Sequence, residues 1–237
     1  MSRDGISVIL PAYNEEENIR EAVEDAVKFL RTIRNPWEII IINDGSNDKT
    51  GGLAEKISQS QPRVRVIHHD KNFGYGRSLS DGFAASLYNY IFFTDSDRQF
   101  DINALEVMWP LAKTGVVDLV IGYRINRQDL FMRKFLSRSY NILADYLFGL
   151  DVKDIDCAFK IFKKEIFKKI KIESNNFFVN TEILAKAKYY KFKILEVGVP
   201  HFPRRAGKSS VSFKYIPLTI KELFRIKKSI NYLREKR

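Results

Sequence analysis

The sequence predicts an α/β protein built on a mostly parallel sheet with helices on both faces. Short runs rich in Ile, Val and Phe recur through the first half of the chain, helical patterns separate them, and polar loops follow them. Strands buried on both faces of a parallel sheet have such near-continuous apolar sequences, and strand–helix alternation is typical of a doubly wound sheet. The expected strands are Ile6–Leu10, Glu38–Ile42, Val64–His68, Tyr90–Thr94 and Asp118–Gly122.

Four helices are expected between consecutive strands. Asp48 and Thr50 can begin the second helix and Asp101 can cap the fourth, because their side-chain oxygens accept hydrogen bonds from backbone N–H groups that have no partner within the helix. The chain shows no internal repeat and no low-complexity linker. The expected helices lie near residues 15–31, 47–60, 75–88 and 101–113.

The composition narrows the class of protein. The chain has 237 residues, 45% of them hydrophobic, which suffices for a sizeable core. Cys157 is the only cysteine, so no internal disulfide can form. The N-terminus has no signal-peptide pattern, and the longest apolar runs fall far short of the roughly 20 residues that span a bilayer. We therefore expect a cytoplasmic protein, soluble or peripheral on the cytoplasmic face of a membrane.

The net charge of +11 is concentrated near the C-terminus. Residues 203–237 contain eleven Lys and Arg residues but only two acidic residues. Such a tail can face nucleic acid, anionic lipid or phosphorylated substrates, or it can simply keep the chain soluble. Aromatic residues are not interleaved with the basic ones as a base-stacking platform requires, and this argues against a nucleic-acid partner.

Apolar residues in this tail recur at steps of three and four, which defines one side of a helix. Basic residues such as Lys221 and Lys228 lie elsewhere on the helix. A basic amphipathic helix is typical of an interfacial membrane anchor, and the alternative is docking onto the preceding domain. Residues 131–150 are open to the same two interpretations, core packing or contact with lipid. The apolar stripe of the tail comprises Ile216, Ile220, Leu223, Ile226, Ile230 and Leu233.

Polar residues and glycines follow every predicted strand. Ligands of open α/β sheets bind beyond the carboxyl ends of the strands, so these loops are expected to line one site. The convergence of five such loops favours a polar ligand. The loops contain Pro11–Glu15, Asn43–Asp48, Asp70–Gly76, Asp95–Gln99, and Gly122 with Arg124.

Asp95 and Asp97 flank one small residue directly after a buried strand. Side chains at positions i and i+2 of an extended segment point the same way, and two converging carboxylates repel each other unless a cation lies between them. Gln99 adds an amide oxygen. Hard oxygen ligands of this kind suit Mg²⁺ or Mn²⁺ and leave coordination positions for diphosphate oxygens. The sequence therefore predicts a metal site formed by Asp95, Asp97 and Gln99.

Two common nucleotide-binding motifs are absent. The glycines after the third strand do not form G-x-G-x-x-G, and the chain has no P-loop. The Gly45 turn after Asp44 lets a nucleotide approach the backbone closely, and Asp44 could accept hydrogen bonds from a base edge. No pattern supports a Ser-His-Asp triad, and the three histidines, His68, His69 and His201, are expected to be structural.

Taken in order, the loop motifs resemble the inverting family 2 glycosyltransferases of the GT-A fold. The motifs are P-x-x-N-E from Pro11, N-D-G-S-x-D-x-T from Asn43, N-x-G-x-G from Asn72 and D-S-D-x-Q from Asp95. The resemblance covers residues 5–212. It implies a Rossmann-like GT-A catalytic domain over residues 1–212, followed by the basic amphipathic helix over residues 213–237.

Four segments of the second half narrow this resemblance. They are similar to the dolichyl- and polyprenyl-phosphate sugar synthases, such as the dolichol-phosphate mannose synthases. The implied reaction moves a hexose, with inversion at the anomeric carbon, from a GDP- or UDP-linked donor to a polyprenyl or dolichyl phosphate. The segments are Gly122–Arg124, Arg133–Arg138, Asp154–Lys160 and Arg204–Ser209.

The resemblance also implies roles for individual residues. Asp95, Asp97 and Arg124 would be catalytic. Asp95, Asp97 and Gln99 would hold Mg²⁺ or Mn²⁺ and, with it, the donor diphosphate. Pro11, Tyr13, Glu15 and Asp44 would hold the nucleoside, whereas Arg124, Arg133, Ser137 and Arg204 would hold the acceptor phosphate or the donor phosphates.

The chain departs from the family pattern in three of its motifs. Asn43 replaces the usual first Asp of its motif, and Ser96 replaces Ala between the two aspartates. Tyr75 and Arg77 stand where a Lys and a small residue are common. The segment from Asp154 is a looser match to the mannose synthases, which weakens the case for mannose as the sugar.

The acceptor separates two possible functions. A phosphate acceptor is already ionised at pH 7 and needs little general-base catalysis, in keeping with a site in which Arg outnumbers candidate bases. A family 2 transferase acting on a soluble glycan or another hydroxyl acceptor would need a carboxylate base, for which Asp154 or Asp156 could serve. With a lipid acceptor, the tail or a membrane-anchoring partner subunit would supply the membrane contact.

Overall fold

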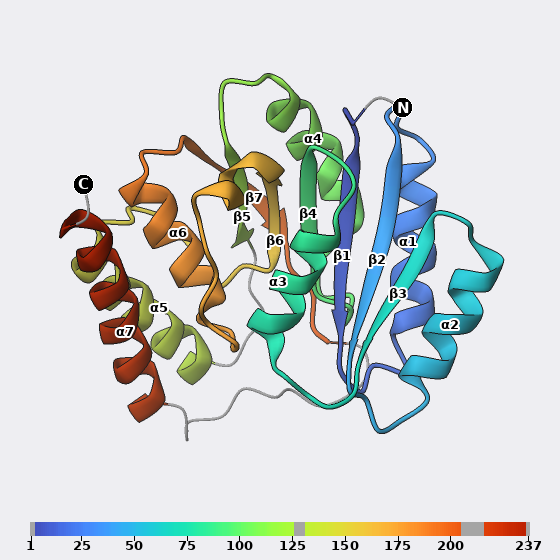
Figure 1. Cartoon of the computed structure of the whole chain (residues 1–237), viewed down its shortest axis with the longest axis horizontal. Helices are drawn as coiled ribbons and strands as arrows, with labels where there is room; N and C mark the ends of the chain where they lie inside the picture. Colours follow the sequence, from blue (N-terminus) through green and yellow to red (C-terminus); the bar gives the residue numbers. More distant parts are fainter. Residues whose placement is uncertain (1–2, 126–130, 205–215, 236–237) are drawn as a thin grey trace.

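A computed structural model describes residues 3–125, 131–204 and 216–235, apart from the side chains of 131–136 and 216–217. Within these residues seven strands form one sheet with helices on both faces (Figure 1), in the order β3-β2-β1-β4-β6-β5-β7. β6 is antiparallel to both of its neighbours, whereas the other neighbouring pairs are parallel. The strands are β1 (Ile6–Ala12), β2 (Trp37–Asp44), β3 (Val64–His69), β4 (Tyr90–Thr94), β5 (Leu119–Ile125), β6 (Phe159–Lys163) and β7 (Ile194–Pro200).

The helices confirm the expected alternation. The five predicted strands and the four predicted helices are present, with ends that differ by up to four residues. The side chain of Asp48 accepts the Thr50 N–H at 2.9 Å, and that of Asp101 accepts the Asn103 N–H at 2.9 Å, so both predicted helix starts are confirmed. The helices are α1 (Ile19–Leu30), α2 (Thr50–Ser60), α3 (Tyr75–Ala85), α4 (Leu105–Lys113), α5 (Phe131–Phe148), α6 (Val179–Tyr189) and α7 (Ile216–Glu235), with short 3₁₀ turns η1 (Ile102–Ala104) and η2 (Lys164–Lys168).

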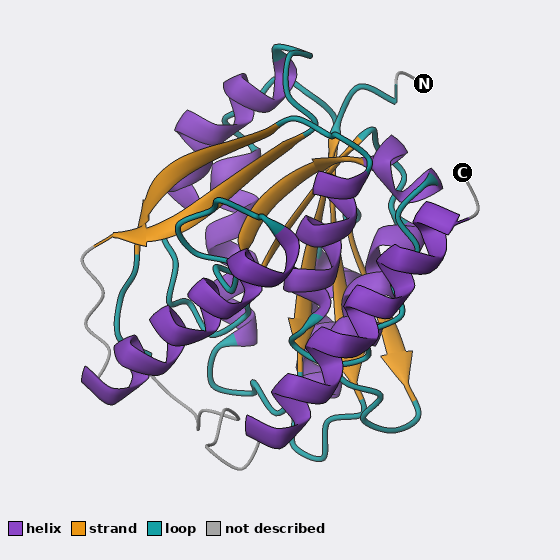
Figure 2. Ribbon diagram, turned by 90° about the vertical axis from the view of Figure 1, so that its left-hand side faces the viewer, coloured by secondary structure: helices purple, strands orange, loops and turns teal. Residues whose placement is uncertain are grey.

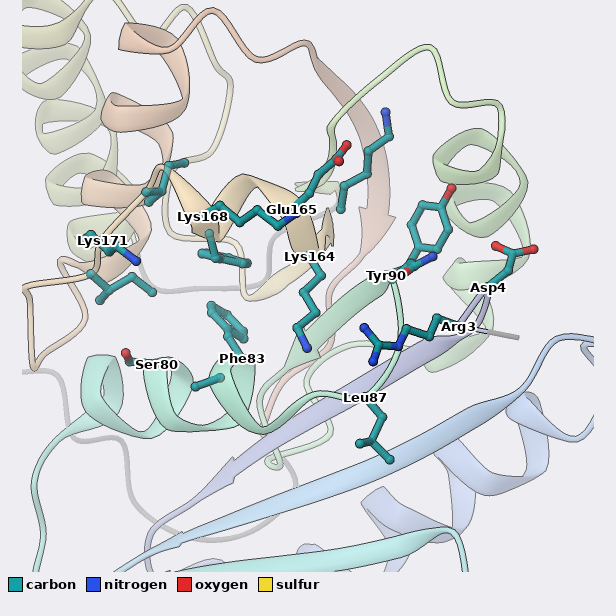
Figure 3. Close-up of a pocket in the computed structure, with 16 residues that line it drawn as sticks. Arg3, Asp4, Ser80, Phe83, Leu87, Tyr90, Lys164, Glu165, Lys168 and Lys171 are labelled. Carbon is teal, nitrogen blue, oxygen red and sulfur yellow. The ribbon is translucent and has the colours of Figure 1, made fainter. Parts of the chain in front are cut away.

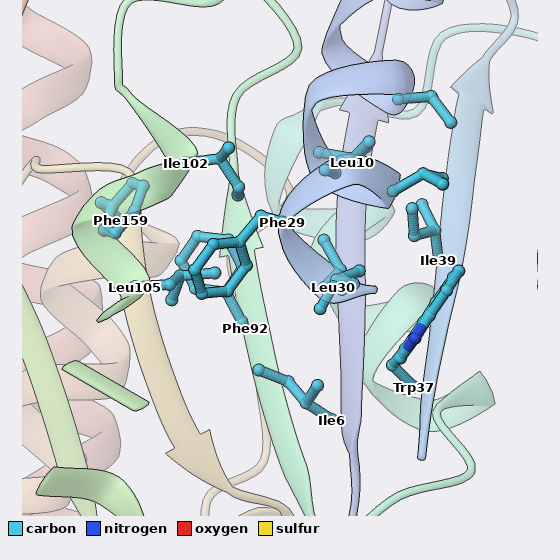
Figure 4. Packing of buried hydrophobic residues seen from close by; sticks show 14 of the residues in the cluster. Ile6, Leu10, Phe29, Leu30, Trp37, Ile39, Phe92, Ile102, Leu105 and Phe159 are labelled. Carbon is cyan, nitrogen blue, oxygen red and sulfur yellow. The ribbon is translucent and has the colours of Figure 1, made fainter. Parts of the chain in front are cut away.

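The sheet separates two hydrophobic cores. Alternate side chains of a strand point to opposite faces, so Ile39 and Ile41 pack with α1, α2 and α4, whereas Ile40 and Ile42 pack with α3, α6 and α7. Figure 4 shows Phe29 and Leu30 of α1 lying against the first of these faces. Helix layers on both faces bury the strands and leave the carboxyl ends of the parallel strands open to a ligand.

Three elements of the second half were missed by sequence reasoning. β6 has an apolar sequence interrupted by Lys160, whose side chain is buried. β7 lies at the sheet edge and is mostly half-buried, so its pattern is weak. α6 is buried nearly all round, which removes the one-sided apolar pattern by which amphipathic helices are recognised.

α7 is the predicted C-terminal helix, and its apolar stripe faces inward. Leu223, Ile226 and Ile230 are buried in the same core as residues of α5 and α6. Arg225 forms an ion pair with Glu173 at 3.3 Å, which further ties this helix to the segment before α6. The structure therefore supports the second interpretation of the stripe, in which the helix docks onto the preceding domain.

α5 and α7 lie side by side at one end of the sheet (Figures 1 and 2). The segment that was open to core packing or lipid contact, residues 131–150, forms α5 and contributes the buried Ala144 to the core. Neither of these helices, nor any other in the described part of the chain, is long and apolar enough to cross a bilayer.

Candidate active site

The loops after β1 and β2 interlock at the carboxyl edge of the sheet. Asn14, with a φ of 56°, receives the Asn47 N–H on its side chain at 2.9 Å and donates its own N–H to the Ser46 hydroxyl at 3.0 Å. The Glu15 N–H reaches the Thr50 hydroxyl at 2.8 Å. The P-x-x-N-E and N-D-G-S-x-D-x-T motifs therefore form one polar cradle, with Tyr13 exposed at its rim.

Asp44 anchors the next loop. Its buried carboxylate accepts the N–H groups of Phe73 at 2.9 Å and Gly74 at 2.8 Å, and a His69 ring nitrogen lies 2.7 Å away. These bonds confirm a structural role for His69 and show a positioning role for Asp44 that sequence reasoning did not foresee. Contact between Asp44 and a nucleoside stays a prediction.

The anchored loop carries Tyr75 to the aspartate pair. Gly74 has a φ of 98°, and a Cβ there would lie 2.2 Å from the Asn175 carbonyl oxygen. At Gly76 a Cβ would lie 2.1 Å from the Ser174 carbonyl oxygen. Only glycine fits these close approaches, and with them the Tyr75 hydroxyl donates to Asp95 Oδ1 at 2.8 Å. The departure from the family pattern at Tyr75 was the one sequence signal for this contact.

The two aspartates follow β4, as the sequence predicts. The middle residue, Ser96, donates its hydroxyl to the Pro11 carbonyl at 2.8 Å, so the predicted nucleoside residue Pro11 is a buried strand residue that holds this loop. The Gln99 N–H donates to Asp97 Oδ1 at 3.1 Å. Burial and the negative charge of Asp97 raise the pKa of Asp95 to about 7, against the opposing hydrogen bond from Tyr75.

Arg204 brings a positive charge to these acids. Its guanidinium donates to Asp97 Oδ2 at 3.4 Å and also bonds Glu15. Burial raises the pKa of Glu15, while hydrogen bonds from Asn18 and Arg204 act in the opposite direction. The segment leading to Arg204 is paired with the aspartate loop, because the Phe202 N–H donates to the Gln99 carbonyl at 2.8 Å. The structure thus places Glu15, Asp97 and Arg204 together.

Arg124 lies in a bidentate ion pair with Asp154. Its Nε and one terminal nitrogen donate to the carboxylate at 2.6 and 2.8 Å, and its backbone N–H adds a third bond at 3.2 Å. Both side chains are buried. Burial alone would lower the pKa of the Arg124 guanidinium, but Asp154 raises it and the net shift is upward. The pair occupies Nε and one terminal nitrogen of Arg124, so a substrate that leaves the pair intact would have to approach the other terminal nitrogen.

A buried lysine holds the loop that carries Asp154. The Lys160 ammonium donates to the carbonyls of Ile155, at 3.0 Å, and Cys157, and to the Asn180 side chain at 3.0 Å. Burial lowers the pKa of Lys160 and raises that of Cys157 to about 12, so this thiol is not a nucleophile at neutral pH. A lysine inside the apolar run from Ala158 to Phe162 was the sequence signal for this buried role.

Two predicted phosphate ligands lie on α5. The side chain of Arg133 is outside the described part of the structure, so its predicted role cannot be compared with geometry. Ser137 is half-buried on the same helix. The R-R-A-G-K-S segment after Arg204 is likewise outside the described residues. The contacts described above bring together the loops of Pro11, Tyr13, Glu15, Asp95, Asp97, Gln99 and Arg204.

The acids suit a hard divalent cation. The pKa of Asp95 is raised first by burial and then by the negative charge of Asp97, and a cation bound between the two carboxylates would offset both effects. Among the described residues no group of three or more His, Cys, Asp or Glu side chains forms a complete metal cage. Mg²⁺ and Mn²⁺ accept such partial sites, in which phosphate oxygens and water complete the coordination shell.

A separate groove lies elsewhere on the molecule. It has a volume of about 850 Å³ and is lined by Arg3, Phe83, Lys164, Lys168 and Glu165 among others (Figure 3). It lies where β1 and β4 begin, at the edge opposite the aspartates. None of the predicted site residues lines it, so the candidate site is the open polar edge at the strands' carboxyl ends.

Comparison with known proteins identifies the family. Residues 7–171 match the model of glycosyl transferase family 2. The chain belongs to this family. The family 2 glycosyltransferase resemblance and the GT-A-type α/β fold predicted from the sequence are thereby confirmed.

Several curated relatives carry names that specify an acceptor. The chain is 29% identical over 210 residues to undecaprenyl-phosphate 4-deoxy-4-formamido-L-arabinose transferase of Pectobacterium atrosepticum, covering 88% of this chain and 63% of that protein. It is 32% identical over 215 residues to dolichyl-phosphate beta-glucosyltransferase of Dictyostelium discoideum, covering 82% and 65%. Glycosyltransferase AglD of Haloferax volcanii is 30% identical over 207 residues, covering 84% and 33%. The chain therefore spans from a third to just under two thirds of these relatives.

Solved structures share the fold. Glucosyl-3-phosphoglycerate synthase from Mycobacterium tuberculosis, in complex with Mn²⁺ and uridine-diphosphate-glucose, superposes with a TM-score of 0.71 at 20% identity, covering 96% of this chain and 79% of that one. At this identity the likeness establishes the fold alone.

Proposed function

We propose that this protein transfers a hexose from a GDP- or UDP-linked donor to a polyprenyl or dolichyl phosphate, with inversion at the anomeric carbon. The observation that carries the proposal is that Arg204 bonds both Asp97 and Glu15, whose charges in turn act on Asp95, at the carboxyl edge of the sheet. The relatives named for undecaprenyl and dolichyl phosphate support the acceptor class.

The donor would lie across the cradle formed by the first two loops. Tyr13 and Glu15 would contact the nucleoside, and Pro11 and Asp44 would support this region from beneath, through the bonds to Ser96 and to the Phe73–Gly74 backbone. Asp95, Asp97 and Gln99 would hold Mg²⁺ or Mn²⁺ against the diphosphate. When bound, such a cation stabilises the negative charge that develops on the departing nucleoside diphosphate.

Arg204 would bind a phosphate group at this edge of the sheet. Its guanidinium now bonds two carboxylates, Glu15 and Asp97. A phosphate oxygen would be an equivalent anionic partner, and guanidinium groups bind phosphate in a bidentate manner. Arg133 and Ser137 would complete the acceptor site from α5. Arg124 would contribute its fixed positive charge, since Asp154 holds its Nε and one terminal nitrogen.

The alternative, transfer to a soluble glycan or another hydroxyl acceptor, would need a carboxylate base. Asp154, one of the two predicted candidates, is buried in its ion pair with Arg124. The Asp154 carboxylate accepts three hydrogen bonds from Arg124, so it would have to give up part of this pairing to take a proton from an acceptor hydroxyl. This argues for the phosphate acceptor, which carries its own charge. A membrane-anchoring partner subunit and a place on the cytoplasmic face of a membrane complete the proposal.

The test offers the purified protein two acceptors. Radiolabelled UDP- and GDP-hexoses are incubated with Mn²⁺ and either a short-chain prenyl phosphate or a neutral glycan. We expect transfer to the prenyl phosphate, its loss in EDTA, and a loss of at least about 10²-fold in turnover for Asp97→Ala, the scale of removing one electrostatic stabiliser. Transfer to the glycan alone would establish the alternative, and full activity in EDTA would exclude the metal.

A further inference from the structure

The outward sides of α5 and α7 expose large apolar side chains that the proposed chemistry does not use. Tyr146 is 86% exposed, Ile142 63%, Phe224 61% and Ile220 48%. On each helix the two residues are four positions apart, so they lie on one side of it. Exposed apolar residues that cluster in this way mark interaction surfaces, whereas scattered ones carry no meaning.

These residues are not needed for packing, because the opposite sides of both helices are already buried. Ala144 of α5 and Leu223, Ile226 and Ile230 of α7 fill the core. Since α5 and α7 are neighbours (Figure 2), we treat the exposed residues of both helices as one surface. We call it the α5–α7 surface and define it by Ile142, Leu143, Tyr146, Ile220 and Phe224.

The exposed charged residues beside this surface are mostly positive, with Asp145 of α5 an acid among them. Lys221, Lys227 and Lys228 of α7 are exposed and form no ion pair within the described residues. The neighbouring acid, Glu222, forms an ion pair with Arg225 in which the nitrogen and oxygen atoms are 2.9 Å apart. Aromatic and aliphatic side chains flanked by unpaired lysines are typical of helices that lie in a membrane interface, with the apolar groups among acyl chains and the cations against anionic headgroups.

The two helices that carry this surface begin at the catalytic end of the molecule. α5 follows β5, which carries Arg124, and α7 follows the segment that carries Arg204. Figure 1 shows both helices starting at the level of the carboxyl ends of the parallel strands. A bilayer against α5 and α7 would therefore lie beside the candidate site rather than at the groove on the opposite edge.

We infer that the α5–α7 surface docks the protein on an anionic lipid bilayer. On α7 the residues that contact lipid are thus Phe224 and Ile220, the exposed member of the predicted stripe, whereas Leu223, Ile226 and Ile230 of that stripe are buried in the core. The inference deepens the proposed function, because a prenyl-phosphate acceptor is held in a bilayer, but vesicle binding itself requires neither donor nor acceptor.

The test compares two triple variants of the full chain by sedimentation with vesicles. Ile142→Ser, Tyr146→Ser and Phe224→Ser are combined in the surface variant. Leu87→Ser, Val107→Ser and Val116→Ser, at comparably exposed positions on other elements, form the control. We expect the surface variant to lose at least about tenfold in partition onto phosphatidylcholine vesicles containing phosphatidylglycerol, since three apolar side chains no longer enter the interface. The control variant should bind as the wild type does.

Several outcomes distinguish docking on an anionic bilayer from other roles of this surface. Wild-type binding should weaken as salt rises and with vesicles of phosphatidylcholine alone. Equal binding of both variants would overturn the inference, as would a wild-type dimer that the surface variant converts to a monomer in the absence of lipid. Circular dichroism checks that both variants are folded. If the triple variant is not folded, the test is repeated with the single variant Phe224→Ser, which should show a smaller loss of vesicle binding. Activity on a soluble short-chain prenyl phosphate should be unchanged in the surface variant. Vesicle binding thus tests the docking surface, and activity on the soluble acceptor tests the proposed reaction independently.

Discussion

Tyr75 donates its hydroxyl hydrogen to Asp95 Oδ1 at 2.8 Å. Asp44 and the close packing of Gly74 and Gly76 hold the backbone on either side of Tyr75 in place. Burial and the charge of Asp95 raise the pKa of Tyr75, so the phenol stays protonated and remains a donor. The bond favours the ionised form of Asp95, the form that a cation needs.

Replacing Tyr75 by Phe tests this relationship. Without the hydrogen bond, the pKa of Asp95 should rise above about 7, and the pH at which Mn²⁺ binding reaches half its maximum should move up by about one unit or more, the scale of a hydrogen bond to a charged group. Titration of Mn²⁺ from pH 5 to 9 measures the shift. Tyr232→Phe, on α7, should leave the profile unchanged, and an unmoved profile for Tyr75→Phe would mean that the bond does not tune Asp95.

Asp95 should lower the stability of the metal-free protein above neutral pH. Its pKa is near 3.8 when unfolded and about 7 when folded, so the folded state binds the extra proton between these values. Stability therefore falls as pH rises from about 4 to 7. Asp95→Asn removes this penalty and should raise the free energy of unfolding at pH 8 by about 1–4 kcal/mol, with no gain at pH 4. Urea unfolding at both values measures it, and an equal gain at pH 4 would point to a cause other than titration.

The Arg124–Asp154 pair should matter for folding before it matters for chemistry. Asp154→Asn leaves a buried guanidinium without its counter-charge and should cost about 3–5 kcal/mol in the free energy of unfolding. The double replacement Arg124→Leu with Asp154→Leu should recover part of that loss, because no unpaired charge is then buried. If Asp154→Asn were as stable as the wild type yet inactive, Asp154 would be a base and the hydroxyl-acceptor function would be favoured.

α7 should contribute to the stability of the whole domain. Ile226→Ala opens a cavity in the shared core and should cost about 2–5 kcal/mol. Phe224→Ala, two positions away on the exposed side, should change stability by less than about 0.5 kcal/mol. Thermal and urea unfolding of the two variants provide a matched comparison. Equal, small effects would mean that the helix is only loosely attached, and that a protein lacking residues 216–235 retains its core.

The sequence by itself determined the parallel half of the sheet and the residues at its carboxyl edge. Strand–helix alternation is local, and parallel strands bring their carboxyl ends to one edge whatever the side chains do. Asp95, Asp97 and Gln99 could therefore be assigned to one loop beside Pro11 and Glu15 without coordinates. The family resemblance rested on the same loops, so it was secure for the same reason.

Only the tertiary structure decided which partner each polar group takes and which side of α7 is covered. Arg124 meets Asp154, and Arg204 meets Asp97 across 107 positions of the chain. Periodicity shows that one side of a helix is apolar, but lipid and a protein core satisfy it equally, so Leu223 and Ile226 could not reveal their own surroundings. Which charges pair depends on how distant segments of the chain pack together. Attraction between charges depends on their separation in space, so it leaves no local pattern in the sequence.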